Sequence, residues 1–401
     1  MDIEKSWEDF PALRQKINGK KIIYFDNACT ALRPRQVIEK MLEYFEKYPG
    51  CVGRSAHKFG TMATEKFNES RAAVARFVGA DEKEIIFTKN TTESLNLVAN
   101  SIGLKKNDVV VASDREHNSN LVPWLLLSER IGIKHSVISS KKDETFDLNA
   151  FAQGMSRNVK VVSIVHSSNI DGYTLPVKDI AKISHDYGAL VVLDGAQSVP
   201  HKKMDVKRLD IDFLAFSGHK MLGPSCGVLY GKYHLLEKLD AFMVGGDTVK
   251  NTTYRSFELL KPPERFEAGL QDYAGIIGLS AAIEYLNKIG LDKVEAHEVE
   301  LNKIINKSVL DTGVAEIVGV KDAALRGGIT SFNIKGIGNH DIAMMLDQSN
   351  IMIRSGYHCC HSWFNARKID GSARVSLYLY NTKEEAKVFA ENIQKISMLA
   401  K

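Results

Sequence analysis

The chain has 401 residues, 44% of them hydrophobic and 25% charged, and a formal net charge of +4. This length predicts two domains of a globular protein, and the small charge, with no lysine or arginine block, does not suggest nucleic acid or an anionic membrane as a partner. The start of the chain is charged from its second residue and no uncharged run reaches the roughly 18 residues of a membrane span, so we predict neither a signal peptide nor an anchor. Five cysteines, an odd number, favour a reducing cytoplasm over a disulfide framework.

Short β-branched runs alternate with helix-like segments from about residue 80 to 231. The seven runs lie at 84–88, 108–114, 134–139, 159–168, 189–196, 212–218 and 227–231. Helical spacing occupies 91–103, 121–132 and 176–188. Several runs are almost continuously apolar, which is typical of strands buried on both faces of a mainly parallel sheet. We therefore predict an α/β domain that binds ligands beyond the carboxyl ends of its strands.

The pattern changes after about residue 275. Segments with helical spacing lie near 272–289, 293–312, 339–349 and 383–399, with short strand-like runs between them. This part of the chain predicts a smaller α+β unit. We expect a large domain over 16–275 and a small domain formed by 1–15 and 276–401.

Polar side chains follow the first strand-like run. Asn90 or Thr91 is placed to cap the next helix, and Glu93 is placed to close a capping box. A capped helix start that carries hydroxyl groups, here Thr91 and Thr92, also suits an anion. Taken alone, the segment is equally well explained as a plain cap.

Other strand ends carry His117, Asn169, Asp194 and Lys220. Alone, each has an ordinary structural explanation, such as a packed histidine or a carboxylate that caps a helix. Lys220 follows an apolar run and a small-residue turn, so a pKa lowered by burial would make it a Schiff-base candidate. Jointly these residues are the parts that hold a phosphorylated pyridine aldehyde: a lysine for the imine, an aspartate for the ring nitrogen and a histidine to stack on the ring.

Several motifs in a fixed order carry a resemblance to a known family. They are "YFDNACTALRP", "NTTESLNLVA", "REHNSNLVPW", "HSSNIDGYTLP", "VLDGAQSVPH", "FSGHKMLGP", "RFEAG", "RSGYHCC" and "ARVSLYLYNT". The chain resembles the class V aminotransferase group of pyridoxal phosphate enzymes, most closely the SufS-type cysteine desulfurases. The resemblance implies fold type I and a cytoplasmic homodimer. It also implies conversion of L-cysteine (or L-selenocysteine) to alanine, with the sulfur passed to an acceptor or scaffold protein of iron–sulfur cluster assembly.

By this resemblance Lys220 forms the imine with pyridoxal 5'-phosphate, Asp194 pairs with the ring nitrogen, and His117 stacks on the ring and carries a proton for the substrate thiol. The remaining residues implied are Asn169 and Gln197 at the ring hydroxyl, Thr91, Thr92, Ser217 and His219 at the phosphate, and Arg374, Arg354, Asn169 and Arg54 at the substrate. Cys359 falls on the position of the cysteine that takes up sulfur. No metal ligand set is implied.

The stretch "RSGYHCCHSWF", residues 354–364, places two cysteines between two histidines. Zinc is an alternative to a reactive thiol, but adjacent cysteines suit tetrahedral zinc poorly. For a reactive Cys359, positive charge from His358, His361 or Arg354 would favour the thiolate. Cys360 is either a second sulfur carrier or a small buried residue, and a vicinal disulfide requires a strained backbone.

Two classes of alternative stay open. Another class V reaction, such as that of a selenocysteine lyase, a cysteine β-lyase or an epimerase, would leave Cys359 without a role as sulfur acceptor. A metal-binding structural protein would use the cysteines and histidines of 358–361 as ligands.

The chain also departs from the family pattern. Gly53 stands where a histidine precedes the arginine of the early substrate loop, and Leu270 stands where a threonine reaches the partner subunit's phosphate, a place that Gln271 could fill. Cys226 lies in a shortened glycine turn, and Cys360 follows Cys359 where a small residue is usual. These departures predict a divergent member of the family.

Overall fold

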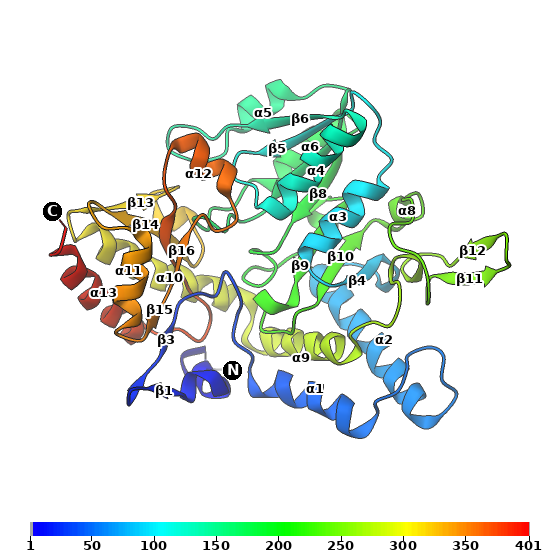
Figure 1. The fold of residues 1–401 in the computed structure, drawn as a ribbon, viewed down its shortest axis with the longest axis horizontal. Coiled ribbons are helices and arrows are strands. Elements are labelled where there is room, and N and C mark those ends of the chain that lie inside the picture. The colour runs from blue at the N-terminus through cyan, green and yellow to red at the C-terminus, as the bar shows by residue number, and fades with distance from the viewer. Residues whose placement is uncertain (1–2, 401) are drawn as a thin grey trace.

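The computed structural model describes residues 3–400, so the outermost residues of the predicted small domain, 1–2 and 401, lie outside the described part. Seven strands form a central sheet in the order β4-β10-β9-β8-β7-β5-β6 (Figure 1). The strands are β4 (Ile85–Thr88), β5 (Val109–Ser113), β6 (Lys134–Ile138), β7 (Val159–Val165), β8 (Leu190–Asp194), β9 (Phe213–Ser217) and β10 (Gly227–Gly231). β10 is antiparallel to both of its neighbours and the other pairs are parallel. The predicted seven-stranded, mainly parallel sheet is confirmed.

Helices on both faces explain why the strands are almost continuously apolar. Neighbouring residues of one strand enter different cores: Val110 packs with one hydrophobic cluster and Val111 with another. One face is covered by α3 (Thr91–Ser101) and α4 (Asn118–Ile131), and the other by α2 (Lys58–Val78), α6 (Val177–Asp186) and α9 (Tyr273–Ile289). Side chains alternate across a strand, so a strand between two helical layers has no polar face.

A second, antiparallel sheet forms the C-terminal unit in the order β13-β14-β17-β16. Its strands are β13 (Ala315–Val318), β14 (Ile329–Ile334), β16 (Arg354–Gly356) and β17 (Ser372–Ser376). The helices α10 (Leu291–Leu310), α11 (Asn339–Asp347) and α13 (Lys383–Ser397) pack with it around a core of its own. The smaller α+β unit that the sequence predicts is therefore present.

Part of the N-terminal segment also belongs to this second core. β3 (Ile23–Tyr24) pairs in parallel with β15 (Ile351–Met352), and Phe25 packs in the core of the C-terminal unit. The domain boundary between residues 15 and 16 stays a prediction. These contacts show that residues 23–25, which the prediction assigns to the large domain, pack with the small unit.

The remaining helices and strands belong to neither sheet described above. They are β1 (Lys16–Ile17), β2 (Lys20–Lys21), α1 (Arg35–Lys47), α5 (Leu148–Gly154), α7 (Val206–Leu209), α8 (Tyr233–Leu236), β11 (Val249–Thr252), β12 (Phe257–Leu259) and α12 (His361–Arg367). The hairpin β11–β12 projects from the body of the molecule (Figure 1). Within residues 3–400 no helix combines the length and the apolar character needed to cross a bilayer.

Candidate active site

Strands β4, β5, β7, β8 and β9 run in the same direction, so their carboxyl ends meet at one edge of the large sheet. Asp194 is the last residue of β8 and Ser217 is the last residue of β9. Thr91, His117 and Lys220 come within a few residues of other strand ends at the same edge. The topology thus gathers residues that are far apart in the sequence.

Lys220 ends a short 3₁₀ turn, Gly218–Lys220, that follows β9. The turn requires glycine at Gly218, because a Cβ there would lie 2.7 Å from the carbonyl oxygen of Pro224. Burial lowers the pKa of the Lys220 amine and raises the pKa of Asp194, and the attraction between the two groups opposes both shifts. Asp194 is buried, and its Oδ1 accepts a 2.9 Å hydrogen bond from the Ala196 N–H. The site therefore combines an amine biased toward its neutral form with a carboxylate shielded from water.

His117 is the N-cap of α4. Its Nδ1 accepts a 3.1 Å hydrogen bond from the Ser119 N–H, so in the neutral ring the proton is on Nε2. Burial, with the positive charges of Lys220 and Arg374, lowers the His117 pKa to about 3. The imidazole is uncharged near neutral pH, and its free ring nitrogen is a hydrogen-bond donor.

Thr91 and Ser217 bind each other at the start of α3. The Thr91 N–H donates to Ser217 Oγ at 2.8 Å, and the two hydroxyl oxygens lie 2.6 Å apart. Thr92 is exposed and its hydroxyl lies 2.7 Å from Ser119 Oγ. Buried His219 Nδ1 has no hydrogen-bond partner among the described residues. The roles predicted for these residues at a phosphate stay predictions.

The predicted cap of α3 is only partly confirmed. Asn90 is the N-cap, and its Oδ1 accepts the Glu93 N–H at 3.0 Å. Glu93 does not return a bond to the Asn90 N–H as a capping box requires. Its Oε2 accepts the Lys89 N–H at 2.6 Å instead, so the predicted box is wrong by one residue.

Arg374 lies on the inner strand β17 and is almost fully buried. Its Nη1 donates to the Asn169 carbonyl oxygen at 3.0 Å, and its Nη2 lies 3.3 Å from Asp26 Oδ1. Asp26 also lies 3.5 Å from Arg354 Nε, so one carboxylate joins two predicted substrate arginines. Asp26 was not predicted from the sequence, although an acidic residue directly after the apolar run "IIYF" was a signal.

Of the buried polar side-chain atoms without a partner among residues 3–400, three belong to predicted site residues. They are Gln197 Oε1, His219 Nδ1 and Arg374 Nε. Gln197 uses its other side-chain atom, Nε2, to donate to the Ala28 carbonyl oxygen at 2.7 Å. An unpaired buried polar atom costs roughly 1–3 kcal/mol, so such a group of atoms is typical of a site that binds a polar ligand.

Cys359 stands in a turn between β16 and α12, with its side chain exposed. Its φ of 58° and the φ of 47° at His358 lie in the left-handed region, which non-glycine residues seldom adopt and which persists only where surrounding contacts hold it. The Asn118 N–H donates to the Cys359 carbonyl oxygen at 2.7 Å, and Asn169 Nδ2 donates to the His358 carbonyl oxygen at 2.7 Å. The turn is therefore fixed to the residues that follow β5 and β7.

His358 does not supply the positive charge that the sequence suggested. It is buried, its Nε2 lies 2.9 Å from Ser372 Oγ, and burial with the charges of Arg374 and Arg354 holds its pKa well below the usual value. His361 lies at the start of α12, where it stacks on Tyr357. The neutral side chain of His358 therefore packs in the interior beside the turn.

All five cysteines lie within the described residues and are free thiols. Cys360 is buried, and Cys226 is buried in the main core, with Sγ 4.0 Å from the Gly275 carbonyl oxygen. Within residues 3–400 no group of three or more histidine, cysteine and acidic side chains is arranged to hold a metal ion.

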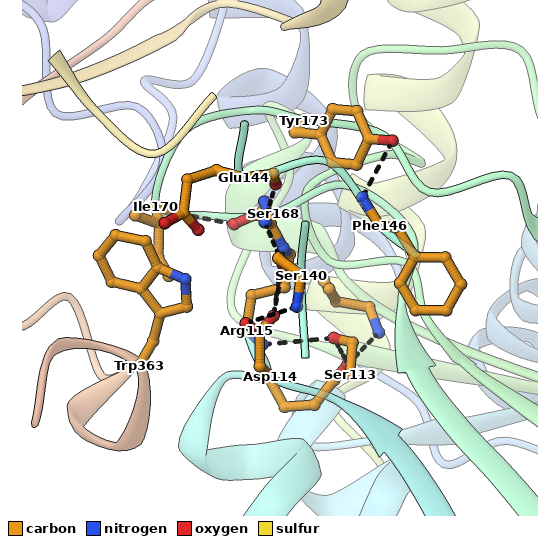
Figure 2. Close-up of polar contacts among 12 residues, drawn as sticks. Ser113, Asp114, Arg115, Ser140, Glu144, Phe146, Ser168, Ile170, Tyr173 and Trp363 are labelled. Atoms are coloured by element: carbon orange, nitrogen blue, oxygen red, sulfur yellow. Dashed lines mark hydrogen bonds and ion pairs between the residues drawn. The ribbon is translucent and has the colours of Figure 1, made fainter. Parts of the chain in front are cut away.

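The helix α12, which was not predicted from the sequence, joins the two units. Trp363 reaches from it toward Ile170, and both pack in a small cluster with Cys360 and Phe364 (Figure 2). At the end of the helix Arg367 binds Asp114 at 2.8 Å and Glu144 at 2.6 Å. Residues 360, 363 and 364 follow a helical spacing, which was the available signal.

A buried ion pair lies next to Asp114 and Glu144, the two residues that bind Arg367. Arg115 is fully buried, with Nη1 3.1 Å from Asp171 Oδ2, and its Nη2 donates to Ser140 Oγ at 2.8 Å (Figure 2). Asp171 in turn accepts the Val320 N–H at 2.9 Å, which connects the pair to the small unit.

Arg54 is exposed and forms an ion pair with Asp247. This contact involves none of the other predicted site residues. Its predicted role at the substrate stays a prediction.

Known proteins resemble this chain along its whole length. The family model described as aminotransferase class-V matches residues 23–389. A probable cysteine desulfurase of Halalkalibacterium halodurans is 39% identical over 391 residues, which cover 96% of each chain. The apo structure of a cysteine desulfurase from Thermococcus onnurineus NA1 has a TM-score of 0.95 at 39% identity and covers 99% of both chains. The cysteine desulfurase CsdA of Escherichia coli, solved with an S-sulfonic acid, has a TM-score of 0.92 at 29% identity over the full length of both.

The match extends from the first strand of the small unit into its last helix, and it includes the sheet edge where Lys220 and Asp194 lie. The fold, the order of the motifs and the similarity to relatives over nearly the whole chain agree. The chain belongs to the class V aminotransferase family.

Proposed function

We propose that the chain is a pyridoxal phosphate-dependent cysteine desulfurase, which moves the sulfur of L-cysteine onto Cys359 and releases L-alanine. One relationship carries the proposal. The turn that holds Cys359 is hydrogen-bonded to Asn118 and Asn169, which follow β5 and β7. These strands end at the same edge of the sheet as β8, which carries Asp194, and β9, which Lys220 follows. The relatives named as cysteine desulfurases support it.

Pyridoxal 5'-phosphate fits the described residues. The unpaired Gln197 Oε1 and His219 Nδ1 are atoms that a ring hydroxyl and a phosphate would satisfy, and Asp194 is a buried carboxylate that a cationic ring nitrogen would balance. We assign the cofactor to Lys220, Asp194, His117, Asn169 and Gln197. The phosphate residues in the assignment are Thr91, Thr92, Ser217 and His219. When bound, the group supplies an electrophilic carbon and an electron-withdrawing ring.

The protein groups have separate tasks in this reaction. The lowered pKa of Lys220 increases the fraction of neutral amine, which takes the Cα proton of cysteine. Asp194 holds a carboxylate in a buried position, where a cation on the ring nitrogen is strongly favoured. His117, neutral and flat, lies at the start of α4, where its Nε2–H is available to hydrogen-bond the substrate thiol.

Arg374 and Cys359 act on the two ends of the substrate. The planar guanidinium of Arg374 is suited to bind the substrate carboxylate through two parallel hydrogen bonds. The Cys359 thiolate attacks the substrate sulfur. A sulfur–sulfur bond forms, the substrate's Cβ–S bond breaks, and the carbon fragment takes up protons to leave as alanine. The persulfide on Cys359 then serves an acceptor or scaffold protein of iron–sulfur cluster assembly or another sulfur-transfer pathway.

We also propose that two copies pair and complete each other's site. Apolar side chains stand exposed beside the β11–β12 hairpin, among them Leu270 at 72% and Phe257 at 71% exposed. Arg54 and Asp247 pair in the same region, around a cavity of about 530 Å³ that also reaches Arg71 and Tyr273. A protein–protein interface is one of the sites that exposed apolar patches mark, and a second copy of the chain would bury these side chains.

An absorbance spectrum combined with a cysteine assay tests the function. Wild type is expected to show a cofactor band and to release alanine and sulfide in equal amounts with a thiol reductant present. Lys220→Ala should lose the lysine-dependent band and the activity, while Lys160→Ala, an exposed lysine, should keep both. Cys359→Ala should keep the band and lose persulfide formation, with Cys51→Ala as its control. Full sulfide release by Cys359→Ala would point instead to a lyase reaction without an enzyme persulfide.

A further inference from the structure

Cys360 directly follows the exposed Cys359, yet its own side chain is fully buried. Its apolar neighbours are Ile170, Val318, Trp363 and Phe364. Its Sγ lies 3.2 Å from Asn169 Oδ1 in donor geometry. Burial raises the pKa of the Cys360 thiol, so the sulfur keeps its proton and the S–H can donate that hydrogen bond.

Asn169, in the large unit, forms hydrogen bonds with two residues of the small unit. Its Nδ2 donates to the His358 carbonyl oxygen at 2.7 Å, and its backbone carbonyl accepts from Arg374 at 3.0 Å. A carbonyl oxygen only accepts, so the NH₂ of the amide must face His358 and Oδ1 must face the Cys360 thiol. The His358 carbonyl thus determines which way the amide points, and the S–H of Cys360 satisfies the buried amide oxygen.

We propose that Cys360 is a positioning residue for the Cys359 turn and not a second sulfur carrier. Its S–H donates to Oδ1 of the Asn169 amide and holds that amide in place, and the amide holds the backbone at His358, one residue before Cys359. The inference rests on the proposed desulfurase function, because the position of the turn affects a rate only if Cys359 takes up sulfur.

The left-handed backbone explains why this support matters. His358 and Cys359 both have positive φ angles, which cost free energy in non-glycine residues and persist where the surroundings fix them. The closely packed cluster around Cys360 leaves no surface from which a second sulfur could be received, since its side chain has no exposed area.

Mass spectrometry on wild type tests the assignment without any variant. The holoenzyme is incubated with L-cysteine, trapped with an alkylating agent and digested. We expect the added sulfur on Cys359 and none on Cys360. Sulfur on Cys360 would overturn the inference, even if Cys360 variants do not fold.

Two variants test the positioning role by single-turnover kinetics. Cys360→Ala removes the donor and is expected to slow persulfide formation on Cys359 about fivefold, as loss of one hydrogen bond typically does, while the cofactor band and its shift on binding cysteine stay as in wild type. Cys360→Ser keeps a donor and should recover most of the rate. Cys51→Ala, whose sulfur lies 3.9 Å from Tyr273 Oη in another part of the chain, is the matched control.

The outcomes separate the two proposals. A wild type with no cofactor band and no alanine from cysteine would defeat the desulfurase function itself. An active wild type whose Cys360→Ala variant forms the persulfide at the wild-type rate would defeat only the positioning role, as would a serine variant no faster than alanine.

Discussion

The backbone N–H of Asn118, the first residue of α4, donates a 2.7 Å hydrogen bond to the carbonyl oxygen of Cys359. This bond joins the helix capped by His117 to the turn that carries the exposed thiol. Asn118 also contributes its side chain, whose Nδ2 lies 3.1 Å from His361 Nδ1. Two parts of one residue thus hold the turn against the large unit.

Replacing Asn118 with proline removes the backbone donor. Proline is well tolerated at the first position of a helix, and His117 before it already has an extended backbone. Because a hydrogen bond contributes about 1 kcal/mol, we expect Asn118→Pro to slow persulfide formation on Cys359 about fivefold, measured in a single turnover. Asn118→Ala, which removes the side chain alone, is the control and should be closer to wild type. Equal rates in the two variants would show that the backbone bond has no effect.

Asp26 is expected to set the affinity for the substrate through Arg374. Asp26→Ala leaves Arg374 without its only ion-pair partner among the described residues, so its guanidinium is less well held for a carboxylate. We expect KM for cysteine to rise about fivefold with kcat nearly unchanged, since the contact at 3.3 Å is a long one of about 1 kcal/mol. Asp26→Asn retains a hydrogen-bond acceptor, so its KM should lie between the values for wild type and Asp26→Ala. A change in kcat alone would argue against a role in binding.

Arg367 anchors α12, and its loss should destabilise the protein. Charge-assisted hydrogen bonds to Asp114 and Glu144 contribute more than neutral ones, so we expect Arg367→Ala to lower the free energy of unfolding by about 2 kcal/mol in urea. Arg367→Lys keeps the charge without the planar fork and should be intermediate. Arg130→Ala, at the exposed end of α4, controls for the loss of a surface arginine. A variant as stable as this control would exclude an anchoring role.

Glu116 should make stability depend on pH. It is buried next to His117, and burial raises its pKa to about 7 from an ordinary value of 4.5, against the opposing hydrogen bonds from Ser113, Asn120 and the Val165 N–H. The folded chain therefore binds this proton more tightly than the unfolded chain does. The stability that results is fully present below about pH 4.5 and is lost as the pH rises through about 7.

The matched variant for this effect is Glu116→Gln, which has no charge to bury. We expect the Tm of wild type to fall, relative to that of the variant, between about pH 5 and pH 8. Parallel curves of Tm against pH for the two proteins would contradict the raised pKa.

The sequence predicted the helices and strands that leave a recognisable pattern within one short segment of the chain. Neighbouring residues of a central strand, such as Val110 and Val111, are buried in two different cores, so both must be apolar. The result is a continuous β-branched run, and such a run identifies a central strand in the sequence. The strand ends then identified Asp194 and Lys220 as neighbours at one edge, because parallel strands share their carboxyl side. The role of each predicted site residue still depends on experiment.

Contacts between distant segments were not predictable in the same way. Asp26 and Arg374 are 348 residues apart, and only the completed fold brings the short strand β3 beside the small sheet. Of the three residues that the sequence offered as a source of positive charge, His358 is buried and its pKa is lowered, and the sequence did not indicate that burial. The helix α12 was not predicted because it is short and begins with polar residues. Only residues 360, 363 and 364 show its apolar spacing.

If Cys359 takes up sulfur as proposed, the contacts of its backbone bear on how that sulfur leaves the enzyme. The carbonyl oxygen of Cys359 accepts a hydrogen bond from Asn118, and that of His358 accepts one from Asn169. Arg367 anchors the following helix, α12, while the Cys359 thiol is exposed. In the proposed reaction, a sulfur held there would be carried outward by a moving loop only if several of these contacts broke. The proposal therefore implies that the receiving molecule comes to the enzyme and extends its own acceptor atom to Cys359.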